Sequence, residues 1–285
     1  MSRELLATRL ASGAQHLSPF LVLGDPDPAT SIALCVAAVE AGASMLELGL
    51  PYATPSADGP AVQAASMRAL RSGVDVASAW SVLRAVRERC PDVPCNLLVY
   101  ANLVHARGPD RFAREAVAAG ASSLLVPDVP LEEGEELRAA CLAHGLGVVM
   151  LAGPRTPLER LRTLAAAADN FVYLAGHQGV TGARDLDWPN LAARVRTAKA
   201  AVTSPLCIGF GLSTREDLDE VFTAGADIAV VGSHLLRVIA TARATGSDVV
   251  DAYVTALRAL APESKVQGPS PISSTVEVRE NPSCS

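Results

Sequence analysis

Eight short apolar runs are spaced along the chain, and segments with helical periodicity separate them. The runs are continuous rather than alternating, as in strands that are buried on both faces of a sheet. Because a helical segment joins each run to the next, neighbouring strands are expected to be parallel. The predicted strands are residues 20–23, 45–48, 96–100, 123–126, 147–151, 171–174, 206–209 and 228–231.

Signals for helix starts and ends agree with this order of elements. Polar residues at 110–111 and 214–217 precede apolar helical patterns, as at helix N-termini. Glycines follow the ends of four helical patterns, where a C-cap is expected. The pattern predicts one (β/α)8 TIM barrel with an extra N-terminal helix. The four glycines are Gly42, Gly120, Gly145 and Gly225.

A doubly wound sheet is the competing fold. Residues 209–211 contain two glycines, but Thr214 stands where the third glycine of a dinucleotide-binding turn is needed. Residues 1–260 are therefore predicted to form the barrel domain. Residues 261–285 are rich in proline and serine, so this tail is predicted to be disordered.

Composition supports the α/β class and excludes one class of partner. Of the 285 residues, 49% are hydrophobic and only 4% aromatic, so Ala, Val and Leu must form most of the core. The formal net charge is -6, and no block of Lys and Arg occurs. Nucleic-acid binding depends on cation-rich surfaces, so no nucleic-acid partner is expected.

The chain also lacks signals for a membrane or an oxidising compartment. Residues 1–4 carry no apolar signal region, and no uncharged run approaches the roughly 20 residues of a membrane span. The six cysteines include Cys90 and Cys95, which are close but do not form a C-x-x-C pair. We expect a soluble cytoplasmic protein with reduced thiols.

Two carboxylates are the strongest candidates for chemistry. Glu47 lies at the end of a predicted strand, and Asp58 follows in a tight turn. A carboxyl group buried at a strand end is either paired or shifted in pKa, and shifted acids perform acid/base catalysis near neutral pH. The alternative is structural, with Glu47 in a buried ion pair and Asp58 capping a helix.

Three glycine-containing segments follow predicted strands late in the chain, at residues 179–183, 209–213 and 231–234. Backbone N–H groups of such turns, with a helix starting near residues 232–233, can bind a phosphate without Lys or Arg. Barrels often place such a site after their seventh and eighth strands. A phosphorylated ligand is therefore expected.

The remaining side chains give weaker evidence for a catalytic or metal-binding role. His16 and His144 are predicted at surface or helix-end positions, and His177 is the one histidine with a candidate role, in the loop 175–187. No cluster has metal-ligand spacing, no G-x-S-x-G turn occurs, and neither lysine lies in a predicted strand. No metal and no covalent nucleophile are expected.

Several segments resemble the tryptophan synthase alpha subunit family. The resemblance is carried by residues 46–52 and 57–60, and by residues 20–26 around the first predicted strand. It spans about residues 4–258 and excludes only the tail. Further matching segments are residues 100–103, 126–130, 179–182 and 209–211.

The resemblance implies a lyase that splits indole-3-glycerol phosphate into indole and glyceraldehyde 3-phosphate without a cofactor. Glu47 matches the acid/base of the family and Asp58 the carboxylate that accepts the indole N–H. Tyr173 matches a tyrosine beside the reacting side chain, or else only fills the barrel. The phosphate-binding backbone is matched by Gly182, Gly211, Gly232 and Ser233, and the indole pocket by Phe20, Tyr100 and Leu125.

Two departures from the family concern its partner, the beta subunit. Thr54 replaces a common aspartate, and residues 177–178 lack a common arginine of the loop after the sixth strand. The resemblance implies an alpha subunit of an alpha2beta2 complex, while the departures leave open a free-standing lyase that releases indole. A binding barrel with little turnover and a phosphosugar isomerase are further alternatives.

Overall fold

The computed structural model describes residues 2–53, 58–175, 188–209 and 211–261. Eight strands close into a barrel in chain order, and each pairs in parallel with its neighbours, β1 with β8 included. The predicted TIM barrel is confirmed and the doubly wound sheet is excluded. The strands are β1 His16–Val22, β2 Leu46–Gly49, β3 Cys95–Leu98, β4 Ser123–Leu125, β5 Gly147–Ala152, β6 Val172–Ala175, β7 Leu206–Gly209 and β8 Ile228–Val231.

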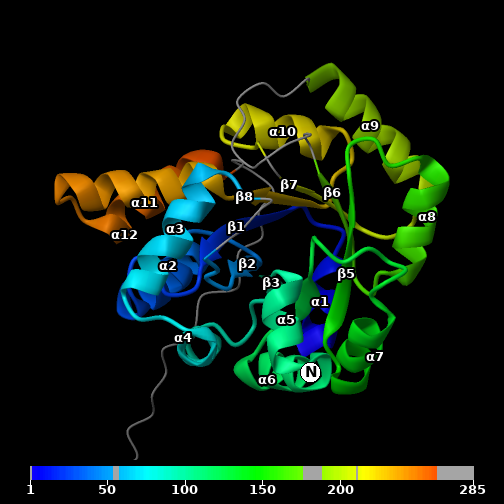
Figure 1. Cartoon of the computed structure of the whole chain (residues 1–285). Coiled ribbons are helices and arrows are strands. Elements are labelled where there is room, and N and C mark those ends of the chain that lie inside the picture. Colours follow the sequence, from blue (N-terminus) through cyan, green and yellow to red (C-terminus); the bar gives the residue numbers. More distant parts are fainter. Residues whose placement is uncertain (1, 54–57, 176–187, 210, 262–285) are drawn as a thin grey trace, which may run out of the picture.

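Helices surround the strands (Figure 1). In the described ranges, α1 precedes the barrel, and some crossovers carry two helices instead of one. The helices are α1 Ser2–Leu10, α2 Pro28–Glu40, α3 Pro60–Arg71, α4 Val76–Arg89, α5 Ala101–Arg107, α6 Pro109–Ala119, α7 Glu135–His144, α8 Leu158–Ala167, α9 Trp188–Ala201, α10 Arg215–Thr223, α11 Ser233–Thr245 and α12 Val249–Leu260.

The helix boundaries follow the local sequence. Thr214 caps α10, and its side chain accepts from the backbone N–H of Asp217 while the Asp217 carboxylate accepts from the backbone N–H of Thr214. The four glycines predicted beyond helix ends all have positive φ, between 74° and 109°. Only glycine adopts this conformation without steric cost, so each one turns the chain from a helix toward the next strand.

The first strand begins earlier than the sequence predicted. β1 starts at His16, whereas the sequence predicted a start at residue 20. Both His16 and Ser18 are buried. These polar residues interrupt the apolar run, so the pattern underestimated the strand. His16 was wrongly placed at a surface or helix end; its Nδ1 lies 3.1 Å from Oγ of Ser44, and burial lowers its pKa.

Small aliphatic residues form most of the core, as the composition predicted. One aromatic contact joins two outer helices, where Trp80 of α4 meets the edge of Phe112 of α6 with ring centroids 5.4 Å apart. The five cysteines of the described ranges are all buried and free.

Helix α1 covers the amino ends of the strands. Leu6 is fully buried, and the Arg3 guanidinium donates to Asp169, which precedes β6. Arg9 donates to the carbonyl of Asp92, which precedes β3. The helix therefore closes one end of the barrel and leaves the carboxyl ends of the strands as the open face, where TIM barrels bind their ligands.

Candidate active site

Glu47 projects into the interior of the barrel. It lies within β2, is only 2% exposed, and accepts a 2.9 Å hydrogen bond from Nδ2 of Asn96. The Tyr173 hydroxyl also donates to this carboxyl group. Tyr173 belongs to β6, which stands opposite β2 in a closed ring of eight strands, so this hydrogen bond must cross the barrel interior.

Burial controls the protonation state of Glu47. Desolvation raises its pKa to about 8, and the hydrogen bonds from Asn96 and Tyr173 oppose that shift without cancelling it. Within the described ranges Glu47 makes no ion pair. The alternative in which Glu47 only forms a buried ion pair is therefore wrong for these ranges. At neutral pH the side chain is therefore mainly a carboxylic acid that can donate a proton.

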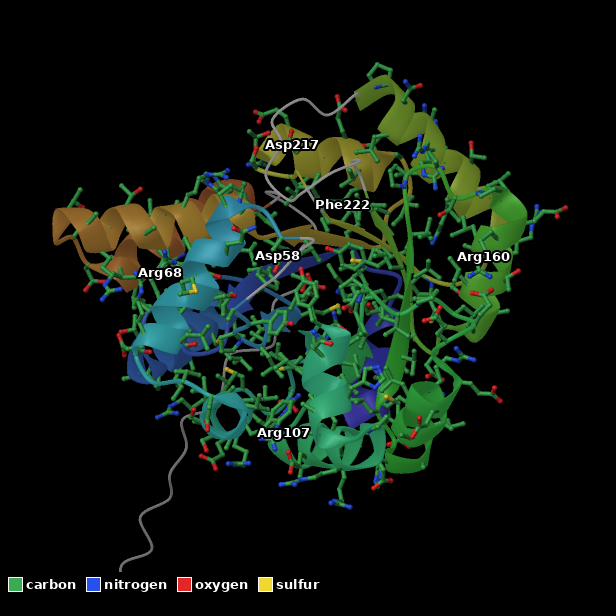
Figure 2. All side chains as sticks on the ribbon, viewed as in Figure 1. Asp58, Arg68, Arg107, Arg160, Asp217 and Phe222 are labelled. Atoms are coloured by element: carbon green, nitrogen blue, oxygen red, sulfur yellow. The ribbon has the colours of Figure 1, made fainter. Side chains whose placement is uncertain are left out.

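Asp58 lies beyond the carboxyl end of β2, directly ahead of Gly59 and α3. It is 8% exposed, and burial raises its pKa to about 6, while a hydrogen bond from Tyr100 opposes the shift. The N-cap of α3 is Gly59 and no side chain caps this helix, so Asp58 is not a capping residue. Figure 2 shows Asp58 near the strands, whereas Arg107 and Arg160 lie on outer helices.

The tyrosine that contacts Asp58 is itself held in place. Tyr100 follows β3, and its ring stacks on that of Tyr52 with centroids 5.3 Å apart. The Tyr52 hydroxyl accepts a 2.8 Å hydrogen bond from Nδ2 of Asn102. Two loops that follow neighbouring strands thus hold the predicted indole-pocket residue Tyr100 against the predicted indole acceptor Asp58.

Tyr173 needs a glycine beside it. A Cβ atom built on Gly209 would lie 1.8 Å from the Tyr173 hydroxyl oxygen, far inside van der Waals contact. Gly209 ends β7, the strand next to β6, so the hydroxyl passes directly over its backbone. The two sequence interpretations of Tyr173 meet here, because the ring fills the barrel and its hydroxyl contacts Glu47.

Phe20 joins the predicted indole pocket to the predicted phosphate site. Its ring lies over Gly49, where an added Cβ would be 2.9 Å from Cζ, and its Cβ lies beside Gly232, at 3.2 Å from an added Cβ. Phe20 is also the register partner of Glu47 on β2. Leu125, the third predicted pocket residue, is buried at the carboxyl end of β4.

The predicted phosphate-binding turns follow β7 and β8. Gly211 has φ of 102°, a left-handed conformation that favours glycine. Gly232 is the N-cap of α11, Ser233 begins that helix, and no side chain caps it. The first N–H groups of this 13-residue helix therefore have no capping side chain and can serve an anion. Gly182 lies outside the described residues, as do Thr54 and residues 177–178.

Sequence reasoning missed Asn96 and Ser123. Ser123 Oγ donates to Oδ1 of Asn96 at 2.8 Å, and Nδ2 of Asn96 donates to Glu47. The three residues are register partners on β2, β3 and β4. A signal was present, because polar residues begin two of the predicted buried strands. Only the register, however, reveals that they meet Glu47.

The described residues contain no group of three or more His, Cys, Asp or Glu side chains arranged to hold a metal ion. Across the same ranges, no helix combines the length and apolar character that crossing a membrane requires.

Comparison with known proteins identifies relatives over most of the chain. Residues 6–264 match the family model described as "Tryptophan synthase alpha chain". A tryptophan synthase alpha chain of Gloeobacter violaceus is 44% identical over 230 residues, covering 79% of this chain and 81% of the relative. One from Prochlorococcus marinus is 40% identical over 232 residues, covering 81% and 84%.

Solved structures of the same family have the same fold as this chain. Tryptophan synthase subunit alpha of Legionella pneumophila superposes with a TM-score of 0.82 at 31% identity, covering 91% of this chain and 97% of that one. A chain of the tryptophan synthase a2b2 complex of Pyrococcus furiosus gives 0.78 at 32% identity, covering 87% and 97%. The matching sequence, fold and extent together place this chain in the tryptophan synthase alpha chain family.

Proposed function

We propose that this chain catalyses the retro-aldol cleavage of indole-3-glycerol phosphate to indole and glyceraldehyde 3-phosphate, as the alpha subunit of a tryptophan synthase in tryptophan biosynthesis. Family membership supports the reaction. The observation that carries the assignment of residues is Glu47, a buried carboxyl group inside the barrel whose pKa is raised to about 8. A group in that state can donate a proton near neutral pH and accept one back.

The reaction needs two proton transfers that Glu47 performs in turn. The neutral acid first protonates C3 of the indole ring, which makes the ring an electron sink. The resulting carboxylate then accepts the proton of the side-chain hydroxyl as the carbon–carbon bond breaks and the aldehyde forms. Glu47 ends protonated as it began, so the cycle needs no cofactor and no external base.

Asp58 has the complementary role. With a pKa of about 6 it is mainly ionised at neutral pH, in contrast to Glu47. An ionised carboxylate accepts the indole N–H and stabilises the positive charge that develops on the ring after C3 is protonated. Tyr100 donates to Asp58 and thereby orients it, while Phe20 and Leu125 supply apolar surface for the ring.

The substrate phosphate is assigned to the turns after β7 and β8. Gly211, Gly232 and Ser233 present backbone N–H groups there, and the amino end of α11 adds its dipole. The contact between Gly232 and Phe20 supports a single ligand that spans both regions, with the phosphate at the turns and the indole over the ring. The family resemblance assigns Gly182 to the same phosphate site, but Gly182 lies outside the described residues.

A beta subunit is the partner assigned to this chain. One matching structure is titled as the tryptophan synthase a2b2 complex of Pyrococcus furiosus, and many relatives are named as alpha chains of this enzyme. These names do not favour the free-standing lyase. The two departures that suggested it, Thr54 and residues 177–178, lie outside the described residues.

The test is turnover of indole-3-glycerol phosphate by the purified chain, alone and mixed with a tryptophan synthase beta subunit. Glu47→Gln should abolish cleavage, a loss of about 10³-fold or more, because its amide can neither donate nor accept the transferred proton. Affinity for the phosphate-bearing ligand should stay nearly unchanged. Glu88→Gln, an exposed change on α4, is the matched control.

The outcomes are distinct. Activity that rises on mixing supports the alpha-subunit role, and equal activity alone would support a free-standing lyase. Absence of turnover in both conditions would leave only a binding role. Cleavage by Glu47→Gln at a rate close to that of Glu88→Gln would refute the assignment of Glu47.

A further inference from the structure

Asn96 is an unusual residue for its position. It lies in the middle of β3 and is only 2% exposed, and its neighbours Cys95, Leu97 and Leu98 are apolar and buried. A buried amide contributes less to folding than a leucine of similar size unless its polar atoms are satisfied. Both amide atoms of Asn96 are in fact used, since Nδ2 donates to Glu47 and Oδ1 accepts from Ser123.

The register of the barrel explains why these groups meet. Glu47 pairs with Asn96 and Asn96 pairs with Ser123 on consecutive strands, so their side chains lie side by side on the inner surface. Two hydrogen bonds connect the three residues in one direction. Ser123 Oγ donates to Asn96 Oδ1 at 2.8 Å, and Asn96 Nδ2 donates to Glu47 Oε1 at 2.9 Å. Ser123 thereby holds the amide with its N–H toward the carboxyl.

We infer that Asn96 is a positioning residue for the acid/base Glu47 and that Ser123 supports it. This inference rests on the proposed function. An amide N–H can only donate, and in a neutral carboxyl the carbonyl oxygen is the better acceptor. The hydrogen bond to Oε1 therefore places the transferable proton on Oε2, the oxygen that Asn96 does not contact.

The same hydrogen bond acts on the charged form. When Glu47 gives its proton to the substrate, the bond from Asn96 becomes charge-assisted and stronger. It therefore stabilises the carboxylate that must form during the reaction. Burial raises the pKa of Glu47 while Asn96 lowers it, and the balance keeps the group able to exchange protons near neutral pH.

No charged group competes with Asn96 for this role among the described residues. The other titratable side chains that interact with Glu47 are Tyr173 on β6 and Cys207 on β7. Burial holds the pKa of both well above their ordinary values, so both are neutral when Glu47 titrates. The hydrogen bonds of Asn96 and Tyr173 are thus the polar influences that oppose desolvation.

The experiment compares Asn96→Leu and Asn96→Leu/Ser123→Ala with wild type. A hydrogen bond to a charged group is worth about 1.5–3 kcal/mol, so removing the donor should raise the pKa of Glu47 by about one to two units. The alkaline limb of kcat/KM should move to higher pH by that amount. The kcat at neutral pH should fall by about tenfold while KM changes much less.

Asn170→Leu is the matched control, because Asn170 is a second buried asparagine, ahead of β6, with no partner for its Nδ2. It should leave the alkaline limb in place. In Asn96→Leu the Ser123 hydroxyl loses its acceptor in an apolar site, which could lower activity by itself. The double variant removes that hydroxyl and so controls for this effect. If both Asn96 variants keep the wild-type limb, or lose stability and rate without moving it, Asn96 is only structural and the inference is overturned.

A second readout separates this inference from the proposed function. The infrared band of the protonated Glu47 carboxyl, identified by its loss in Glu47→Gln, can be titrated without substrate. A midpoint that rises in Asn96→Leu supports the coupling even if the chain proves inactive on indole-3-glycerol phosphate. A midpoint that does not move contradicts it even if cleavage is normal.

Discussion

Glu47 and Asp58 must be in opposite protonation states for the proposed reaction. Asp58 stabilises the positively charged indole ring fully only when ionised, above its pKa of about 6, and Glu47 donates its proton only when neutral, below its pKa of about 8. We therefore expect kcat/KM for cleavage to rise with pH through about 6 and to fall above about 8. Initial rates across this pH range measure both limbs.

Asp58→Asn provides the control for the pH profile. It removes the group assigned to the acidic limb, so activity should be lower and that limb should disappear while the alkaline limb remains. An acidic limb that persists in this variant would show that another group titrates there. A single alkaline limb in the wild type would contradict the assignment of Asp58.

Strand β6 places the Tyr173 hydroxyl directly beside Gly209 of β7. Gly209→Ala places a methyl group where the Tyr173 hydroxyl lies, so the tyrosine must move away from Glu47. Displacement of catalytic groups by about 1 Å costs about 10²-fold, so kcat/KM should fall to that extent. Overpacking should also lower the free energy of unfolding by about 1–3 kcal/mol.

Gly153→Ala is the companion measurement for this prediction. Gly153 follows β5, and the nearest atom to its added Cβ would be Oγ1 of Thr156 at an ordinary 3.7 Å. Activity should stay close to wild type there. Equal activity of the two alanine variants would mean that Tyr173 does not need its observed position.

The proposed site and helix α1 lie at opposite ends of the barrel. Leu6 of α1 is fully buried at the amino ends of the strands, opposite the proposed site. Leu6→Ala should lower the free energy of unfolding by about 2–5 kcal/mol through lost burial and a cavity, measured by urea unfolding. At 25 °C, kcat/KM of the folded fraction should be unchanged.

Leu142→Ala, on the exposed side of α7, should change the free energy of unfolding by less than about 0.5 kcal/mol. A large fall in kcat/KM for folded Leu6→Ala would contradict the separation of the two ends. It would mean that α1 influences the geometry of the strands at the site.

The predictable features are those with a local cause. Continuous apolar runs revealed the strands, and glycines with positive φ marked the turns from helix to strand. The residue pair Glu47 and Asp58 was also visible, since both acids stand in short distinctive segments. The resemblance to a family added the roles that we propose for them.

Long-range contacts could not be predicted in this way. The hydrogen bond between Tyr173 and Glu47 exists because the barrel closes and brings β6 opposite β2. Asn96 reaches Glu47 through the strand register, which single apolar runs do not encode. His16 was misplaced for the related reason that its burial depends on the strand pairing of β1 with β8.

Phe20 occupies space that exists because two neighbouring positions have no side chain, Gly49 on one side and Gly232 on the other. The space left for a flat aromatic ligand therefore depends on the absence of side chains at these two glycines. Redesign of this barrel for a bulkier substituted ring should begin by trimming Phe20, which leaves the acid, the aspartate and the anion-binding backbone untouched.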